Sequence, residues 1–280
     1  MAGAPTLFDR ALSVARAARK RGPEPTILTR TIAEELVERL AFVNRRFEHV
    51  LLIASEPEAI AERLKQGGQV KEVETRGPST EDDLGLPEAR YDAVFSILDL
   101  QTFNDVPGAL IQMRRALKPD GLLLACLFAG DTLTELRQSW LAAEAAVAGG
   151  VSPRVAPMID VRELGGLLQR AGLALPVADL DRTMVRYADA VALIHEIREL
   201  GLSNNLVGRS KTPVSRRLMG AAINHYQQNF ADADGRVRAT VEVAWITGWA
   251  PHESQQQPLK PGSAKARLAD ALKVEEKKLP

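Results

Sequence analysis

The sequence has 280 residues, of which 45% are hydrophobic and 26% are charged. This composition is ordinary for a globular protein, and the length predicts one core domain with added helices. The 36 basic and 36 acidic side chains give a formal net charge of zero, which excludes the basic excess typical of nucleic-acid-binding proteins. A single cysteine, Cys126, lies in an apolar run, so we predict neither a disulfide nor a cysteine-based metal site within the chain.

The N-terminal segment, residues 1–21, is rich in alanine and arginine. It contains Asp9 and has no apolar core of the kind found in secretory signals, so we expect it to belong to the folded protein. No run approaches the roughly 18 apolar residues of a membrane helix. The sequence therefore predicts a cytoplasmic protein without a membrane span.

Helices and buried strands alternate along the first part of the chain. Apolar residues at helical spacing predict a helix between residues 27 and 42, and an alternating pattern predicts a half-exposed strand at 69–75. Continuous apolar runs predict buried strands at 50–54, 91–98 and 121–128. Further helices are predicted at 57–66, 107–117, 132–147 and 161–171. The alternation predicts an α/β fold with a doubly wound, mostly parallel sheet.

The second part of the chain is predicted to complete this sheet around a helical insertion. A strand is predicted near 177–185 and a final strand at 241–249, and we expect the last strand to run antiparallel. The expected organisation is an N-terminal helical extension (1–47), a core domain (48–254) with a helical insertion (188–230), and a polar, mobile tail (255–280).

Six short motifs follow one another in a fixed order. They are Phe8-Asp9-Arg10, Pro23-Glu24-Pro25, Asn104-Asp105-Val106-Pro107-Gly108-Ala109-Leu110, Leu117-Lys118-Pro119-Asp120-Gly121, Gly130-Asp131-Thr132-Leu133 with Glu135-Leu136-Arg137, and Trp249 with His252-Glu253-Ser254-Gln255. Together they resemble the mitochondrial complex I assembly factor five family, which is more distantly similar to the malonyl carrier-protein methyltransferases of biotin synthesis. The resemblance spans about residues 8 to 263. It implies the fold of class I S-adenosylmethionine (SAM) methyltransferases and a protein partner in the assembly of a respiratory NADH dehydrogenase.

Each motif also has a purely structural interpretation. Asn104-Asp105 before a proline can cap a helix, and Gly130-Asp131-Thr132 can form a turn ahead of one. His252-Glu253 could be a metal pair or an ordinary polar loop. Because the four histidines have no metal-ligand spacing, we predict no metal site.

The loop after the first strand lacks the glycines with which a methyltransferase approaches SAM. In register with the family, Ala54, Glu56 and Glu58 occupy the three glycine positions. Their side chains would intrude on the cofactor, and the two carboxylates would lie near its carboxylate group. Ser55 and Glu56 before Pro57 instead predict that the loop leads directly into a capped helix. We expect Glu56 or Glu58 to point toward the region where SAM would lie.

The other positions in register with a cofactor site have also changed. Glu74, or alternatively Glu72, could hold the ribose, but the connection before the acidic segment around Asp82 is too short for a crossover helix. Gln101 and Thr102 stand where the family commonly has histidine and tryptophan. The candidate residues of this vestigial SAM site are Ala54, Ser55, Glu56, Glu74, Asp82, Leu98 and Gln101. No catalytic residue can be named.

Three functions remain open. The first is a pseudoenzyme, a non-catalytic or altered methyltransferase-like protein that binds a protein partner. The second is an active SAM-dependent methyltransferase with an atypical, glycine-less loop, since SAM is the cofactor that the fold implies. The third is a protein arginine hydroxylase, which the resemblance to eukaryotic family members implies.

Overall fold

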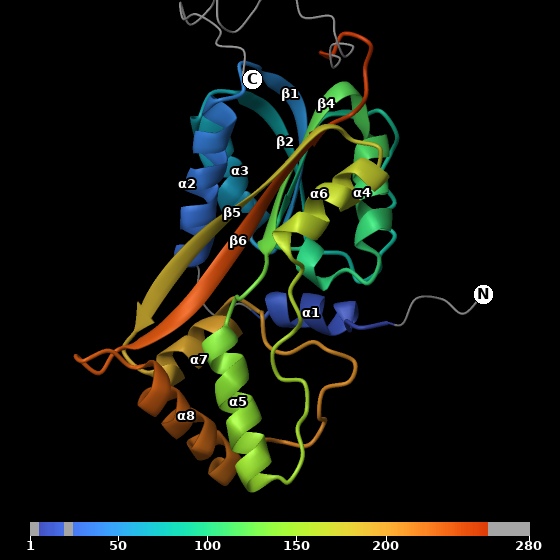
Figure 1. Ribbon diagram of the computed structural model, residues 1–280. Helices are drawn as coiled ribbons and strands as arrows, with labels where there is room; N and C mark the ends of the chain where they lie inside the picture. The colour runs from blue at the N-terminus through green and yellow to red at the C-terminus, as the bar shows by residue number, and fades with distance from the viewer. Residues whose placement is uncertain (1–5, 20–24, 257–280) are drawn as a thin grey trace, which may run out of the picture.

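A six-stranded sheet with the strand order β2-β1-β3-β4-β6-β5 forms the centre of the molecule (Figure 1). This computed structural model describes residues 6–19 and 25–256. The strands are β1 (Phe47–Ala54), β2 (Val70–Arg76), β3 (Tyr91–Ile97), β4 (Leu117–Phe128), β5 (Ala174–Tyr187) and β6 (Val237–Trp249). β1 to β4 are parallel, and β6 runs antiparallel to both of its neighbours, β4 and β5. The predicted α/β fold, doubly wound and mostly parallel with an antiparallel last strand, is confirmed.

Helices cover both faces of this sheet (Figure 1). α2 (Ile27–Ala41) and α3 (Pro57–Gln66) pack on one face, and α4 (Val106–Ala116) and α6 (Val161–Arg170) pack on the other. The central strands are buried on both sides, so Leu51, Val94 and Leu123 are completely inaccessible. This burial follows from their continuous apolar sequences, and the prediction that β1, β3 and β4 are interior strands is confirmed.

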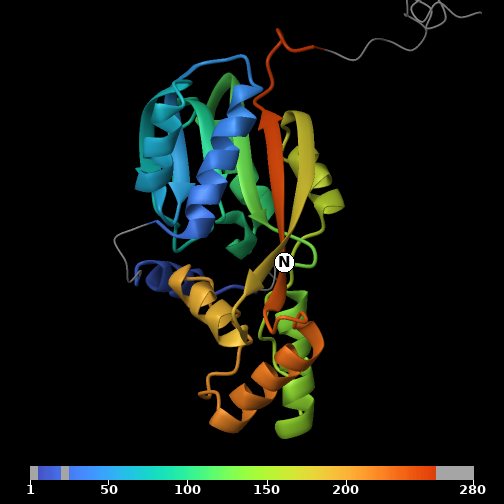
Figure 2. The same cartoon turned by 90° about the vertical axis from the view of Figure 1, so that its left-hand side faces the viewer.

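A helical lobe extends beyond one end of the sheet (Figure 2). It consists of α5 (Thr134–Val147), α7 (Ala190–Glu199), α8 (Arg216–Phe230) and the ends of β5 and β6 that continue past the sheet. Trp140 and Tyr226 lie in its core together with Val237 and Ala239 of β6. The residues predicted as an insertion supply α7 and α8, and α5 packs against α8. α1 (Arg10–Ala17) lies between the lobe and the sheet (Figures 1 and 2).

The motif that begins at Gly130 forms the junction between sheet and lobe. Gly130 has φ +51°, and a Cβ atom there would approach Glu242 Oε2 to 2.0 Å, so any other residue at this position would be strained. Glu242 Oε2 accepts a hydrogen bond from Asp131 N at 2.9 Å, and the Thr132 hydroxyl donates to the carbonyl of Ala129 at 2.8 Å. The Glu135 carboxylate accepts from the backbone and hydroxyl of Thr240 in β6. This motif therefore fixes α5 to the hairpin.

Two connections complete the fold. No helix lies between β2 and β3, where residues 77–90 form an irregular segment, so the expected loss of a crossover helix is confirmed. Gln255 Nε2 donates to Asp120 Oδ1 at 2.8 Å, which joins the last motif to the Lys118-Pro119-Asp120-Gly121 turn. Most of the predicted tail, residues 257–280, lies outside the described residues, as do Pro23 and Glu24.

Candidate functional site

The carboxyl ends of β1, β3 and β4 meet at one edge of the sheet, because these strands are parallel neighbours. Ligands of open α/β sheets bind outside this edge. Four of the predicted site residues, Ala54, Ser55, Glu56 and Leu98, line one pocket here, and α1 lies across the same edge (Figure 1). We therefore consider this edge of the sheet as the candidate functional site.

The loop after β1 consists of Ser55 and Glu56 only, because β1 ends at Ala54 and α3 begins at Pro57. Neither loop residue has a positive φ angle. The backbone therefore needs no glycine, and the predicted direct opening into a helix is confirmed.

The Glu56 carboxylate is turned toward α2. Its Oε2 accepts hydrogen bonds from the backbone N–H and the hydroxyl of Thr26, each at 3.2 Å, and from the hydroxyl of Thr29. The predicted capped start of α3 is wrong in this respect, because the Glu56 side chain makes no capping bond to α3 and anchors the first turn of α2 instead. A glutamate is longer than the side chains that cap their own helix, so it reaches the neighbouring one. Glu58 is exposed.

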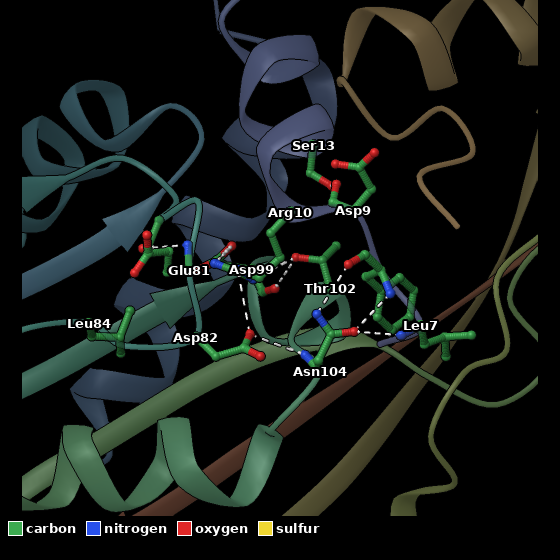
Figure 3. A network of polar contacts seen from close by, with 12 residues as sticks. Leu7, Asp9, Arg10, Ser13, Glu81, Asp82, Leu84, Asp99, Thr102 and Asn104 are labelled. Carbon is green, nitrogen blue, oxygen red and sulfur yellow. Dashed lines mark hydrogen bonds and ion pairs between the residues drawn. The ribbon is translucent and has the colours of Figure 1, made fainter. Parts of the chain in front are cut away.

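Arg10 of α1 reaches into the edge and is 4% exposed (Figure 3). Its Nη2 lies 3.5 Å from Asp99 Oδ1, and its Nε lies 3.7 Å from Asp82 Oδ1. Its Nη1 donates to Thr102 Oγ1 at 2.9 Å, and the guanidinium lies 3.5 Å from the centre of the Phe103 ring. One arginine thus holds together the segments after β2 and β3.

Asn104 holds the segment that leads into α1 by hydrogen bonds to its backbone (Figure 3). Its Oδ1 accepts from the backbone N–H groups of Leu7 and Phe8, both at 2.8 Å, and its Nδ2 donates to the carbonyl of Phe8. Its own N–H donates to Asp82 Oδ1 at 3.2 Å. Asp105 has the predicted role of N-cap for α4, whereas Asn104 fixes the segment that carries Arg10.

Burial raises the pKa of Asp99 to about 6, although the Arg10 guanidinium favours its charged form. The side chain is 3% exposed, and within the described part of the chain its Oδ2 has no hydrogen-bond partner. Arg10 is therefore the main compensation for this carboxylate.

The remaining predicted residues are held by neighbours. The Gln101 side chain donates to the Leu98 carbonyl at 2.6 Å, and Leu98 has φ +52°, so this turn after β3 is strained. The Glu74 carboxylate accepts from the Tyr91 hydroxyl at 2.9 Å and pairs with Arg90 at 3.2 Å. Glu74 lines neither of the pockets that contain Ser55 and Leu98, so the structure does not bring it together with them.

Little space remains beside the loops after β1 and β3 for a cofactor. The two pockets lined by Ser55 and Leu98 have volumes of about 50 and 80 Å³. Small-molecule sites usually have roughly 300 to 1,000 Å³. With Arg10 buried beside Asp99, the residues present do not fit SAM.

The sequence analysis missed the roles of Arg10 and Asp99. Arg10 belonged to the first motif, but its partners lie far along the chain and nothing local identified them. The signal available for Asp99 was an acidic residue directly after a buried strand. In the described ranges, no three or more His, Cys, Asp or Glu side chains are grouped so that they could hold a metal ion. Nor is any described helix both long and apolar enough for a membrane span.

Comparison with known proteins identifies the family. Residues 33–125 match the family described as "Methyltransferase domain". The chain is 33% identical over 275 residues to the arginine-hydroxylase NDUFAF5, mitochondrial, of Rattus norvegicus, and the match covers 91% of this chain and 80% of that protein. The chain belongs to the NDUFAF5 family. The predicted resemblance to a complex I assembly factor family, with the class I SAM methyltransferase fold, is thereby confirmed.

Other relatives of this NDUFAF5-family chain match over shorter segments. The NDUFAF5 protein of Danio rerio is 37% identical over 194 residues, which are 69% of this chain and 60% of that protein. The malonyl-[acyl-carrier protein] O-methyltransferase of Xylella fastidiosa (strain M23) is 34% identical over 168 residues, 60% of this chain and 55% of that enzyme. The chain thus spans less than two thirds of these two relatives.

Proposed function

We propose that this NDUFAF5-family chain is a non-catalytic methyltransferase-fold protein that acts by binding a protein partner. The observation that carries the proposal is the burial of Arg10 against Asp82 and Asp99 at the edge where SAM would lie. The helix α1 fills this edge with a side chain of the protein itself.

The energetics of Arg10 support this proposal. To admit SAM, Arg10 would have to leave and Asp99 would remain buried without its counter-ion. Breaking a buried ion pair in this way costs about 3 to 5 kcal/mol. Such a cost weakens the apparent affinity of a ligand by roughly two to three and a half orders of magnitude. A cofactor that would otherwise bind at about 1 μM would then bind only at roughly 0.1 to 5 mM.

The outer edge of β5 supports the choice of a protein partner. In the described part of the chain no strand pairs with this edge. Apolar side chains along β5 are exposed, including Val177 (57%), Leu180 (37%) and Met184 (47%). An exposed sheet edge with apolar side chains readily accepts an extended segment of another protein. From the family, we propose a subunit of a respiratory NADH dehydrogenase as that partner.

Calorimetric titration with SAM tests the first half of the proposal. We expect no binding tighter than the millimolar range, with a malonyl carrier-protein methyltransferase as the positive control. The triple variant Ala54→Gly, Glu56→Gly and Glu58→Gly is expected not to bind either, because Arg10 remains in place. Micromolar binding by the unmodified protein would overturn the proposal and favour methyl transfer, the second function considered from the sequence.

Affinity capture of NADH dehydrogenase subunits tests the second half. We expect Val177→Lys to reduce capture at least tenfold, because it places a charge on the β5 edge. The matched control is Val151→Lys, which changes an equally apolar and exposed residue (63%) outside the sheet. Equal capture by both variants would argue against the β5 edge as the contact surface.

Arginine hydroxylation is a second candidate function. It is favoured by the 33% identity over 91% of the chain to a protein that carries this name. Mass spectrometry of candidate subunits from aerobically grown cells with and without the protein would detect it as one oxygen atom added to an arginine, with dioxygen as the oxidant and a cellular reductant supplying the two electrons that convert the second oxygen atom to water.

A further inference from the structure

A larger pocket lies beside the edge that Arg10 closes. It has a volume of about 300 Å³ and lies between α2, α7 and the β5–β6 hairpin, on the α2 side of the sheet. Figure 2 shows α7 below α2 next to the hairpin. The pocket contains neither Arg10 nor the loop residues Ser55 and Glu56. It shares Leu28, Ile32, Leu200 and Leu202 with the smaller pocket beside Ser55, so it adjoins the closed edge, and nothing described above gives it a function.

Apolar side chains make up most of the pocket wall. Ile32 and Leu193 come from α2 and α7, and Val243 and Trp245 come from β6. A dry cavity of 150 Å³ lined by such side chains holds one benzene molecule. A pocket of twice this volume has room for a ligand of about twelve non-hydrogen atoms, most of them carbon.

The charged residues of the wall are acidic. The carboxylates of Glu35, Asp181 and Glu196 line the pocket, whereas no lysine, arginine or histidine of the described chain does so. Arg39, just outside, pairs with Glu35 at 2.9 Å and with Asp181 at 2.7 Å. Arg39 also pairs with Asp179 at 2.6 Å, so one cation faces three carboxylates there and the negative charge is in excess.

Glu196 is the carboxylate best placed to receive a ligand. It belongs to α7 and lines the pocket together with Tyr187, whose pKa is raised by burial and by the nearby Glu196 carboxylate. Tyr187 is a neutral neighbour and does not compensate the charge of Glu196. A positively charged group near Glu196 would supply this compensation and gain a charge-assisted hydrogen bond.

From this combination we infer that the pocket binds an apolar organic cation, a small molecule with an aliphatic or aromatic stem that ends in an ammonium group. The stem contacts the apolar wall, and the ammonium group donates to Glu196. Neither Arg10 nor the exposed β5 residues Val177 and Met184 line this pocket, although other residues of β5 do.

Three probes with one common stem test the charge preference: 4-phenylbutylamine, 4-phenylbutanol and 4-phenylbutyrate. We expect calorimetry on the full chain to show that the amine binds at least tenfold more tightly than the alcohol, and that the carboxylate does not bind. Argininamide, a cation with a short stem, is expected to bind at least tenfold more weakly than 4-phenylbutylamine. Equal affinities for the three stem-matched probes, or equal affinities for argininamide and 4-phenylbutylamine, would overturn the inference.

Variants in α7 test the location. Glu196→Gln keeps the size of the side chain but removes the charge, so the amine should lose about tenfold in affinity while the alcohol is unaffected. Glu199→Gln, on the same helix but outside this pocket, is the matched control and should change neither. Ile197→Trp should fill the pocket and abolish binding of both probes, provided that circular dichroism shows an intact fold. Unchanged amine binding by Glu196→Gln would refute the site.

Discussion

Replacing Arg10 with alanine tests the closed edge directly. In the native protein the Arg10 guanidinium lies 3.5 Å from Asp99 Oδ1, and both side chains are 3% exposed. The variant leaves Asp99 as a buried charge without its counter-ion, a change that costs about 3 to 5 kcal/mol. We therefore expect the free energy of unfolding to fall by this amount at pH 8.

The loss should depend on pH, because Asp99 titrates. Its pKa is raised from 3.8 to about 6 in the folded protein, so the folded state holds the proton more tightly than the unfolded one. The contribution of Asp99 to the free energy of unfolding is then greatest below pH 4 and decreases as the pH rises toward 6. Without Arg10 the pKa rises further, and the decrease continues to higher pH. At pH 5 Asp99 is mostly neutral in both proteins, and the variant should lose only about 1 to 2 kcal/mol, from the Thr102 bond and the Phe103 contact.

Urea unfolding followed by tryptophan fluorescence at pH 5 and pH 8 measures both values. The double variant Arg10→Ala and Asp99→Asn is the control, since removing the charge should restore most of the stability lost at pH 8. A loss below about 1 kcal/mol at pH 8, or the same loss at both pH values, would refute the reasoning.

Three further substitutions or reactions test features outside the Arg10 contacts. Gly130→Ala should lower the free energy of unfolding by about 2 to 4 kcal/mol, because of its positive φ and the clash with the adjacent carboxylate. Gly150→Ala is the control and should change the free energy little, because the space around Gly150 is open. Equal effects of the two variants in urea unfolding would contradict the role given to Gly130 at the junction. Cys126 is fully buried, and burial raises its pKa to about 12. The native protein should therefore react with a thiol reagent far more slowly than the unfolded chain. Rapid labelling at pH 8 would contradict this burial. Glu56→Ala should destabilise by about 1 kcal/mol through the first turn of α2, and exposed Glu58→Ala should have almost no effect in thermal unfolding.

The sheet could be predicted because its signals are local. Val94 and Leu123 lie in continuous apolar runs, and a run of this kind between turns is typical of a strand buried on both faces. The direct connection from Ser55 and Glu56 into α3 could also be predicted, because a proline at the next position favours the first turn of a helix. β5 is longer than predicted, because it continues as a hairpin beyond the sheet until Tyr187 pairs with Val237.

The closed edge could not be predicted because it depends on tertiary contacts. Arg10 and Thr102 are 92 positions apart, and their meeting follows from the path of α1 across the sheet. The direction of Glu56 depends in the same way on the position of α2. Short sequence motifs were enough to recognise the family and the missing glycines of the loop after β1. The contacts that fill the edge can be seen only in the folded structure.

The β5–β6 hairpin makes the sheet and the helical lobe one cooperative unit. Its backbone ladder runs without interruption from Val177 opposite Thr247, within the sheet, to Tyr187 opposite Val237, within the lobe. Amide protons along β6 should therefore exchange with solvent at similar, slow rates on both sides of the junction. The lobe cannot open as an independent module, because doing so would break the same strand that the sheet needs. Any sequence change that loosens the lobe is thus expected to reduce the protection of the central strands as well.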